Sequence, residues 1–353
     1  MLITEPIGSI PRPLALVSAA AARDRGELTD LDLEPIYTAA TRDTLAAFEA
    51  TGSPVVTDGE QRKYHNFATY AVHGASNLAP DGFRLQFTGH HRTLPRLTHG
   101  PFRYQRSAAD FVRSARTFTS CPVKQAVIAP SALSLLYPAT ELDDYPREAF
   151  LLDVLDEHER EVRACLAAGA DSVQIDFTEG RLAYKLDPTG GVLRNFVTLN
   201  NLALSRFSDA ERARIGVHTC PGGDRDSTHS ADVDYAEFLP SLFELQAGRF
   251  YIALAREADP RRVLSMIRQY RKPNQHVFVG VIDVLDPVVE TDDLVRDRVL
   301  MAADYIPADR LGTTDDCGYS PFADDVSTSR DTAFAKIRAR VRGTELASVA
   351  VGA

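Results

Sequence analysis

The sequence is poor in residues that support disulfides or indole contacts, with four cysteines and no tryptophan among 353 residues. So few cysteines in so long a chain cannot form the disulfide framework of a secreted protein, which favours a reduced compartment. No apolar run approaches the roughly 20 residues of a membrane span. The N-terminus also lacks the basic and apolar segments of a signal peptide. We therefore expect a cytoplasmic protein without a membrane partner.

The sequence also has no excess of basic over acidic residues, with 39 Lys and Arg against 49 Asp and Glu. The formal net charge is −10, which argues against nucleic acids and anionic membranes as partners. The contents of hydrophobic residues (44%) and charged residues (25%) are ordinary for a globular protein. We expect small molecules as partners, and the composition indicates no particular oligomeric state.

Short apolar runs alternate with amphipathic runs along the whole chain. Strands are expected at residues 6–10, 54–58, 123–128, 172–175, 214–217, 249–254, 277–282 and 310–313. Helices are expected at residues 31–51, 145–168, 196–207, 235–246, 260–270, 291–303 and 327–342. Eight strands that alternate with helices predict an α/β protein with a single (β/α)₈ barrel, the TIM barrel. Residues 1–353 are interpreted as one catalytic domain.

Two long segments interrupt this alternation. Residues 61–120 carry aromatic residues and glycines, which predict a hairpin-like excursion over the barrel mouth after the second strand. Residues 221–234 are rich in Gly, Asp, Ser and His, and long irregular loops of this kind are usually functional. The first segment also holds a basic group, which is either solvated surface or a site for an anionic tail: His90, His91, Arg92, Arg96, Arg103 and Arg106.

Three residues are candidate metal ligands. His218 and Cys220 follow a short strand-like run, and Cys317 lies far downstream. Side chains at positions i and i+2 of a strand point to the same side, so His218 and Cys220 can face one ion. One imidazole and two thiolates suit zinc, and three protein ligands leave one position open for a substrate. The alternative is that the cysteines are small buried hydrophobic residues, as most cysteines are.

Polar residues follow most of the expected strands: Ser9, Glu60, Asp176, Asp283 and Asp315. In a (β/α)₈ barrel these strand ends meet around one axis, where the active site is built. We therefore expect the polar residues near the three metal ligands. The alternative for each carboxylate is a helix cap. A functional role is favoured for Glu60 and Asp176, whereas both interpretations stay open for Asp283 and Asp315.

Six segments together resemble the catalytic barrel of the cobalamin-independent methionine synthase family. In family order they are Ile7-Gly-Ser-Ile-Pro-Arg-Pro, Thr57-Asp-Gly-Glu-Gln-Arg, Val173-Gln-Ile-Asp, Gly216-Val-His-Thr-Cys, Val279-Gly-Val-Ile-Asp and Asp316-Cys-Gly-Tyr. The chain is similar to the short members that have a single barrel. The resemblance implies zinc-dependent transfer of a methyl group to a thiol, homocysteine or a related one. It implies a methylated folate or methylcobalamin as the donor.

The resemblance also implies a role for individual residues. The zinc ligands of the family are matched by His218, Cys220 and Cys317. The residues that hold the amine and carboxylate of homocysteine are matched by Ser9, Glu60 and Asp176. In this interpretation Glu60 and Asp176 are also the catalytic residues.

Two positions depart from the family pattern. Ala253 stands where the family carries a glutamate ligand, and Leu285 stands where its folate enzymes carry a proton-relaying histidine. A fourth ligand would come from the substrate, from water, or from Asp224, Asp226 or His229. Two other functions therefore stay open. One is different zinc–thiol chemistry, such as epoxide opening or C–S bond lysis, and the other is a metal-free decarboxylase or lyase.

Overall fold

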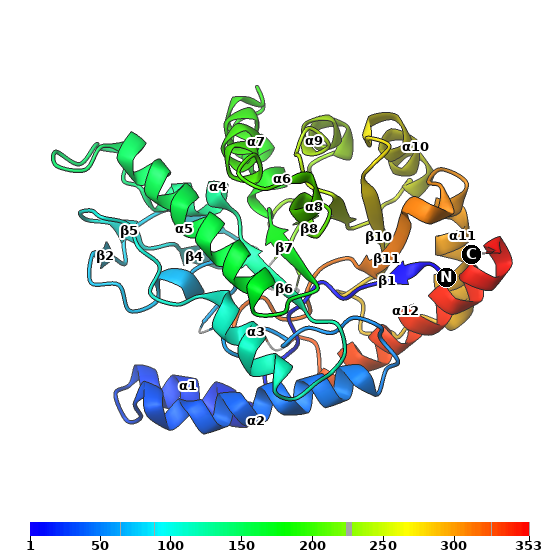
Figure 1. The fold of residues 1–353 in the computed structure, drawn as a ribbon, viewed down its shortest axis with the longest axis horizontal. Helices are drawn as coiled ribbons and strands as arrows, with labels where there is room; N and C mark the ends of the chain where they lie inside the picture. Colours follow the sequence, from blue (N-terminus) through cyan, green and yellow to red (C-terminus); the bar gives the residue numbers. More distant parts are fainter. Residues whose placement is uncertain (64, 88, 224–227, 326, 353) are drawn as a thin grey trace.

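The computed structural model describes residues 1–63, 65–87, 89–223, 228–325 and 327–352, and its centre is a curved, parallel seven-stranded sheet (Figure 1). Its strands are β1 (Ile3–Thr4), β6 (Lys124–Ile128), β7 (Ser172–Asp176), β8 (Ile215–Thr219), β9 (Arg249–Ile252), β10 (His276–Ile282) and β11 (Leu311–Asp315). The order across the sheet is β1-β11-β10-β9-β8-β7-β6. Because every neighbouring pair is parallel, the carboxyl ends of all strands lie at one edge.

The strands are covered on both sides. Every residue of β6, β7, β8 and β11 is buried, as is typical of a parallel sheet that carries helices on its outer face. Helices α5, α7, α9, α10, α11 and α12 surround the sheet (Figure 1). The expected α/β class is confirmed, and the number of strands in the sheet is seven rather than eight.

The helices are bounded mostly by capping residues. They are α1 (Leu14–Asp24), α2 (Asp30–Glu49), α3 (Ala108–Arg116), α4 (Pro130–Leu133), α5 (Arg147–Ala167), α6 (Glu179–Leu186), α7 (Gly191–Leu204), α8 (Asp209–Arg212), α9 (Tyr235–Leu242), α10 (Pro260–Tyr270), α11 (Asp292–Ala303) and α12 (Arg330–Val351). Thr29 caps α2 in a capping box, and Ser329 caps α12. None of the described helices is both long enough and apolar enough to cross a membrane.

The two expected strands nearest the N-terminus differ from the structure. The strand expected at 6–10 is instead the short β1, because Pro6 has no N–H and Ile10 donates to the carbonyl of Gly59 rather than into the sheet. The strand expected at 54–58 makes a single parallel bridge, between Val56 and Val123. Its Thr57 hydroxyl donates to the carbonyl of Gly8 at 2.9 Å. The segment therefore lies between residues 8–10 and β6.

The segment 61–120 contains two small antiparallel strand pairs. β3 (Arg84–Gln86) pairs with β4 (His91–Thr93), and β2 (Leu78–Ala79) pairs with β5 (Arg96–Leu97). The segment also contains a short 3₁₀ helix (Tyr70–Val72) and helix α3, which the sequence interpretation did not anticipate. Figure 1 shows these strand pairs beside the sheet, on the side of β6.

Candidate metal centre and substrate cavity

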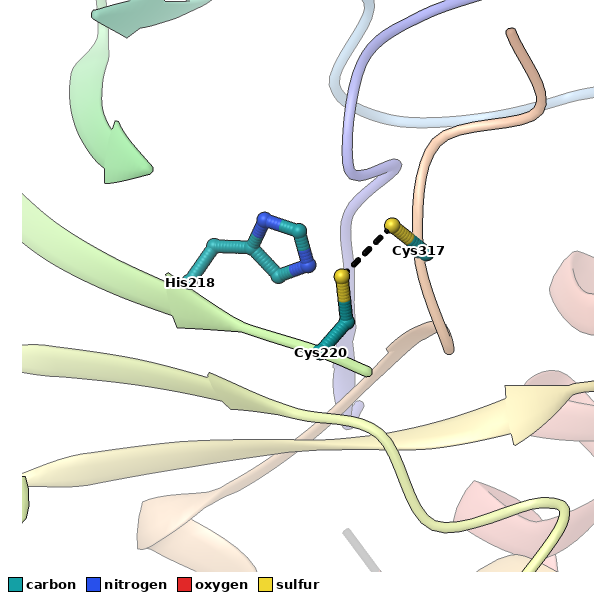
Figure 2. Close-up of side chains that lie close together, drawn as sticks. All are labelled: His218, Cys220 and Cys317. Carbon is teal, nitrogen blue, oxygen red and sulfur yellow. Dashed lines mark hydrogen bonds between the residues drawn. The ribbon is translucent and has the colours of Figure 1, made fainter. Parts of the chain in front are cut away.

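The three candidate metal ligands come together at the carboxyl edge of the sheet (Figure 2). His218 lies on β8, Cys220 follows the end of that strand, and Cys317 follows β11. The two Sγ atoms are 2.8 Å apart, and the potential ligand atoms of the three residues all lie within 4.8 Å of one another. All three side chains are buried. The structure thus brings together residues that are 97 positions apart in the sequence.

The imidazole of His218 is oriented by Asp176. Its Nδ1 lies 3.1 Å from Oδ1 of Asp176, which is its partner in the parallel register of β7 and β8. The same carboxylate oxygen accepts a hydrogen bond from Gln174 at 2.8 Å. The other ring nitrogen, Nε2, is buried and has no hydrogen-bond partner among the described residues. Figure 2 shows that edge of the ring turned toward the two sulfur atoms.

These contacts shift the acidities of the cluster. Burial alone would lower the pKa of His218, but the negative charge on Cys220 and the contact with Asp176 raise it to about 10. Burial opposes ionisation of Cys220, yet the hydrogen bond with Cys317 and the His218 charge hold its pKa well below the usual value. Burial and the Cys220 charge raise the pKa of Cys317 well above its usual range. Two adjacent thiols share one proton here, and a cation would allow both to ionise.

The donor set fits zinc. An unpartnered imidazole nitrogen faces two thiol sulfurs, and a buried polar atom without a partner is costly unless something binds it. A metal-ligating histidine usually donates its other N–H to a carboxylate, which is the position of Asp176. One nitrogen and two sulfurs are ligands that zinc prefers. The residues on this edge are thus arranged as a three-ligand metal site.

Two glycines allow the loops to approach this cluster closely. A Cβ on Gly223 would lie 2.5 Å from the carbonyl oxygen of Gly318 and 3.1 Å from Sγ of Cys317. A Cβ on Gly318 would lie 2.1 Å from Oγ of Ser9. The chain segments that carry Cys220, Cys317 and Ser9 can therefore meet only because these positions lack side chains.

A cavity of about 640 Å³ opens beside the metal ligands. All the predicted site residues line it: Ser9, Glu60, Asp176, His218, Cys220 and Cys317. The rest of its wall is mainly apolar and includes Ile128, Leu135, Leu182, Phe67, Phe87 and Phe322. Phe87 and Phe322 are in edge-to-face contact at 5.9 Å between ring centroids. The cavity therefore combines one polar end with a large apolar body.

Glu60 is a buried carboxylate that has its own cation. Lys63, which is fully buried, places Nζ 3.0 Å from Oε1 of Glu60. Burial raises the pKa of Glu60, and the Lys63 charge works against this rise. Glu60 also has a left-handed backbone conformation (φ 58°), which follows the tight turn at Gly59. Lys63 lies three residues after Glu60 and could have been found by that spacing, but the sequence interpretation missed it.

Ser9 is held at the polar end of the cavity by the chain that follows β11. Its Oγ accepts a hydrogen bond from the backbone N–H of Ser320 at 3.1 Å, and its carbonyl accepts one from Tyr319 at 2.9 Å. Ser9 therefore lies beside the loop that carries Cys317. The structure brings Ser9, Glu60 and Asp176 to one cavity, as the strand-end argument predicted.

Two other strand-end carboxylates do not reach the cavity. Asp315 is buried against Arg340 at 3.0 Å, and Asp283 accepts a hydrogen bond from the N–H of Leu285. Neither residue caps a helix, because Asp315 is in an ion pair and Asp283 accepts within a turn that precedes α11. The expected fourth ligands Asp224 and Asp226 lie outside the described residues. His229 lines the cavity but is not part of the three-residue cluster.

The basic group in segment 61–120 is dispersed among carboxylates. Arg92 pairs with Asp324, and the other pairs are Arg96 with Asp81, Arg103 with Asp153, and Arg106 with Asp30. Of this group, only Arg92 lines the cavity, and its guanidinium lies 3.9 Å from the centre of the Phe322 ring. These arginines therefore do not form a common site for an anionic tail.

A parallel α/β sheet with a His-Cys-Cys cluster and carboxylates around one cavity at its carboxyl edge is typical of enzymes that act on small molecules. Residues 2–330 match the family model described as the catalytic domain of cobalamin-independent synthase. The chain belongs to the cobalamin-independent methionine synthase family, which confirms the family and the methyltransferase class predicted from the sequence. Methylcobalamin, which was expected as one of two possible donors, is contradicted by the cobalamin independence of this family.

Individual relatives agree with this placement. A methionine synthase of Sulfurisphaera tokodaii is 22% identical over 98% of this chain and 92% of that protein. A 5-methyltetrahydropteroyltriglutamate–homocysteine methyltransferase of Ralstonia pickettii is 24% identical, and the match covers 90% of this chain but 39% of the relative. The fold is similar to that of a B12-independent methionine synthase from Shewanella solved with selenomethionine. In that comparison the TM-score is 0.78, the identity 21% and the coverage 99% of both chains.

Proposed function

We propose that this chain is a zinc-dependent methyltransferase that acts on a thiol, with homocysteine as the leading acceptor. The observation that carries the proposal is the cluster of His218, Cys220 and Cys317, in which the bare Nε2 of His218 faces two buried sulfur atoms. When bound, zinc lowers the pKa of a thiol so that the nucleophilic thiolate is present at neutral pH.

The polar end of the cavity would hold the acceptor. We assign the carboxylate of Glu60 to the ammonium group of homocysteine and the Oγ of Ser9 to its carboxylate. In this proposal Asp176 has two roles. It orients His218, and it lines the cavity where it can contact the acceptor. Lys63 supports Glu60 by favouring its ionised form at a buried position.

The donor that we propose is a methylated folate, which would occupy the apolar part of the cavity. The support is the name of the bacterial relatives, 5-methyltetrahydropteroyltriglutamate–homocysteine methyltransferase. The aromatic walls formed by Phe87 and Phe322 suit a flat ring system. Because the nearby arginines are each paired with a carboxylate, recognition of a polyglutamate tail is not part of this proposal.

We also propose that residues 1–353 form one catalytic (β/α)₈ barrel. The segment 54–58 would be the eighth strand of the barrel, and the Val56–Val123 bridge supports its place on one side. On the other side, the support is the hydrogen bonds that Thr57 and Gly59 make with residues 8–10. The strand pairs in 61–120 would be the excursion at the mouth, since Leu85, Phe87 and Arg92 line the cavity.

Metal analysis separates this proposal from a metal-free lyase. Protein purified without chelator should contain about one zinc per chain, and Cys220→Ser with Cys317→Ser should lose both zinc and methyl transfer to homocysteine. Cys121→Ser is the matched control, because Cys121 is outside the cluster and should keep the metal. Full zinc occupancy in the double variant would overturn the ligand assignment. If the double variant loses zinc and the wild type acts on epoxides or thioethers but not on homocysteine, the other zinc–thiol reactions are favoured.

A further inference from the structure

Glu179 is a buried carboxyl group that lines the cavity and that neither the metal cluster nor the acceptor site uses. It is the first residue of α6 and is 5% exposed. Its Oε1 accepts a hydrogen bond from the Ser131 hydroxyl, which in turn accepts one from Asn200 Nδ2 at 2.8 Å. Its Oε2 is buried and has no hydrogen-bond partner among the described residues. One oxygen is thus fixed by Ser131, and the other has no hydrogen-bond partner among the described residues, in a side chain that lines the cavity.

The surroundings of Glu179 favour the neutral acid. Leu135 and Leu182 belong to the same cavity wall, so a charge here would be poorly solvated. Burial raises the pKa of Glu179 to about 8, although hydrogen bonds from Ser131 and from the backbone of Glu179 and Ala132 work against the rise. The charged group that acts on it is Asp176, whose negative charge adds to the effect, while Ser131 and Asn200 are uncharged. These surroundings favour the neutral acid at neutral pH, and Oε2 has no hydrogen-bond partner among the described residues.

We propose that Glu179 is the proton donor to the leaving group of the methyl donor. This inference rests on the proposed function. The acceptor thiolate sulfur attacks the methyl carbon, the new C–S bond forms, and the C–N bond of the donor breaks. Its electron pair passes to the nitrogen, which takes the proton from Oε2 of Glu179. The resulting carboxylate then recovers a proton from solvent. Without this proton the nitrogen would leave as an amide anion, which is far too basic to be expelled.

The alternative role for Glu179 is structural, as the acceptor that fixes Ser131 and Asn200. Glu179→Gln separates the two roles, because the amide oxygen can still accept from Ser131, whereas an amide cannot donate a proton to a leaving group. Glu179→Asp keeps the acid but shortens its reach. The matched control is Glu157→Gln, which changes a buried carboxyl of α5 that does not line the cavity.

The experiment uses zinc-loaded protein with homocysteine and two methyl donors. 5-Methyltetrahydropteroyltriglutamate needs a proton on its leaving nitrogen, and methyl iodide releases iodide without one. For Glu179→Gln we expect a loss of about 10²–10⁴-fold with the folate, as is usual for a general acid. With methyl iodide we expect a change of less than about threefold. Glu179→Asp should recover part of the folate rate, and Glu157→Gln should match the wild type with both donors.

Infrared spectroscopy gives a readout that does not depend on turnover. At pH 7 the protonated carboxyl absorption should be weaker in Glu179→Gln than in the wild type, and the difference spectrum should contain the band of Glu179, because buried Glu161, with a pKa of about 7, contributes equally to both proteins. Equal loss with both donors, no loss with either, or no such band would overturn the role of Glu179. If the wild type uses methyl iodide but not the folate, the Glu179 assignment falls while the proposed thiol chemistry stands. If it accelerates neither reaction, the proposed function itself falls.

Discussion

The Asp176 carboxylate lies 3.1 Å from Nδ1 of His218, and the parallel register of β7 and β8 makes the two residues direct neighbours. This contact fixes the ring so that Nε2 is the nitrogen that faces Cys220 and Cys317 (Figure 2). Carboxylates that hold a metal-binding histidine in this way raise its basicity and set its tautomer. Asp176 is therefore placed to support the proposed metal site, in addition to the substrate role predicted from the sequence.

Asp176→Asn should weaken zinc binding. Loss of such a supporting carboxylate typically lowers metal affinity about 10–100-fold, because the histidine is no longer oriented and polarised. Zinc affinity can be measured by competition with a chromophoric chelator. Glu60→Gln is the matched control, since Glu60 lines the same cavity without contacting His218, and it should keep the affinity of the wild type. Equal affinities of Asp176→Asn and wild type would show that Asp176 serves only the substrate.

Lys63→Met should destabilise the fold and weaken acceptor binding together. The fully buried ammonium of Lys63 lies 3.0 Å from Oε1 of Glu60, and removing one partner of a buried ion pair usually costs about 3–5 kcal/mol. Denaturant unfolding measures this loss. The double variant Lys63→Met with Glu60→Gln should recover part of the stability, because no unpaired charge remains. A double variant no more stable than Lys63→Met would argue against the pair as the cause.

Gly318→Ala should displace the Ser9 hydroxyl. The added Cβ would lie 2.1 Å from Oγ of Ser9, so this oxygen must turn away and lose its hydrogen bond from Ser320. If Ser9 holds the acceptor, KM for homocysteine should rise about tenfold, which is the effect of one lost hydrogen bond to a charged group. Ser9→Ala should show the same rise without strain at residue 318. A rise in Gly318→Ala alone would instead indicate that Cys317 has moved.

The predictions from sequence were best where a local pattern decides the structure. Helix α10 was predicted at its observed bounds, 260–270, because a proline at the first helical position and a strongly amphipathic pattern mark it. The strand ends at Asp176 and His218 were also placed well, and they located the metal cluster. The first strand was misplaced because the backbone of Ser9 and Ile10 bonds to distant residues, Tyr319 and Gly59, which no local pattern reveals.

Residues whose importance comes from tertiary contacts were missed for the same reason. Lys63 looks like a surface lysine in the sequence, and only folding buries it against Glu60. Glu179 has no distinguishing pattern in the sequence, and its raised pKa depends on burial in the cavity wall. Helix α1 was missed because its alanine-rich sequence has little amphipathic pattern, and its burial comes from packing against α2.

Glu161 should make the stability fall as pH rises from about 4.5 to 7. Burial raises its pKa to about 7, although Tyr70 and the N–H of Ala108 donate hydrogen bonds to it. Between these pH values the unfolded chain releases a proton that the folded protein keeps, so ionisation favours unfolding by up to about 3 kcal/mol.

The difference between wild type and Glu161→Gln isolates this contribution. The free energy of unfolding of Glu161→Gln, measured at pH 5 and pH 7.5, should change less over this interval than that of the wild type. Glu148→Gln, an exposed position on the same helix α5, should leave the pH dependence as it is. Parallel pH profiles of wild type and Glu161→Gln would mean that Glu161 ionises normally in the folded protein.

The last prediction concerns the absence of a glutamate at Ala253. Ala253 follows β9 and is buried, and among the described residues three side chains gather as metal ligands, two of them cysteines. In the proposed zinc site a position is therefore open for the acceptor. X-ray absorption should show two sulfur neighbours of zinc in the resting protein and three with homocysteine, at distances of about 2.3 Å. Homoserine, which replaces the sulfur by oxygen, should leave the count at two. A count that stays at two while homocysteine is methylated would place the thiol away from the metal. A fourth protein ligand that persists with homocysteine present would do the same, and either result would make zinc a Lewis acid toward another group of the substrate.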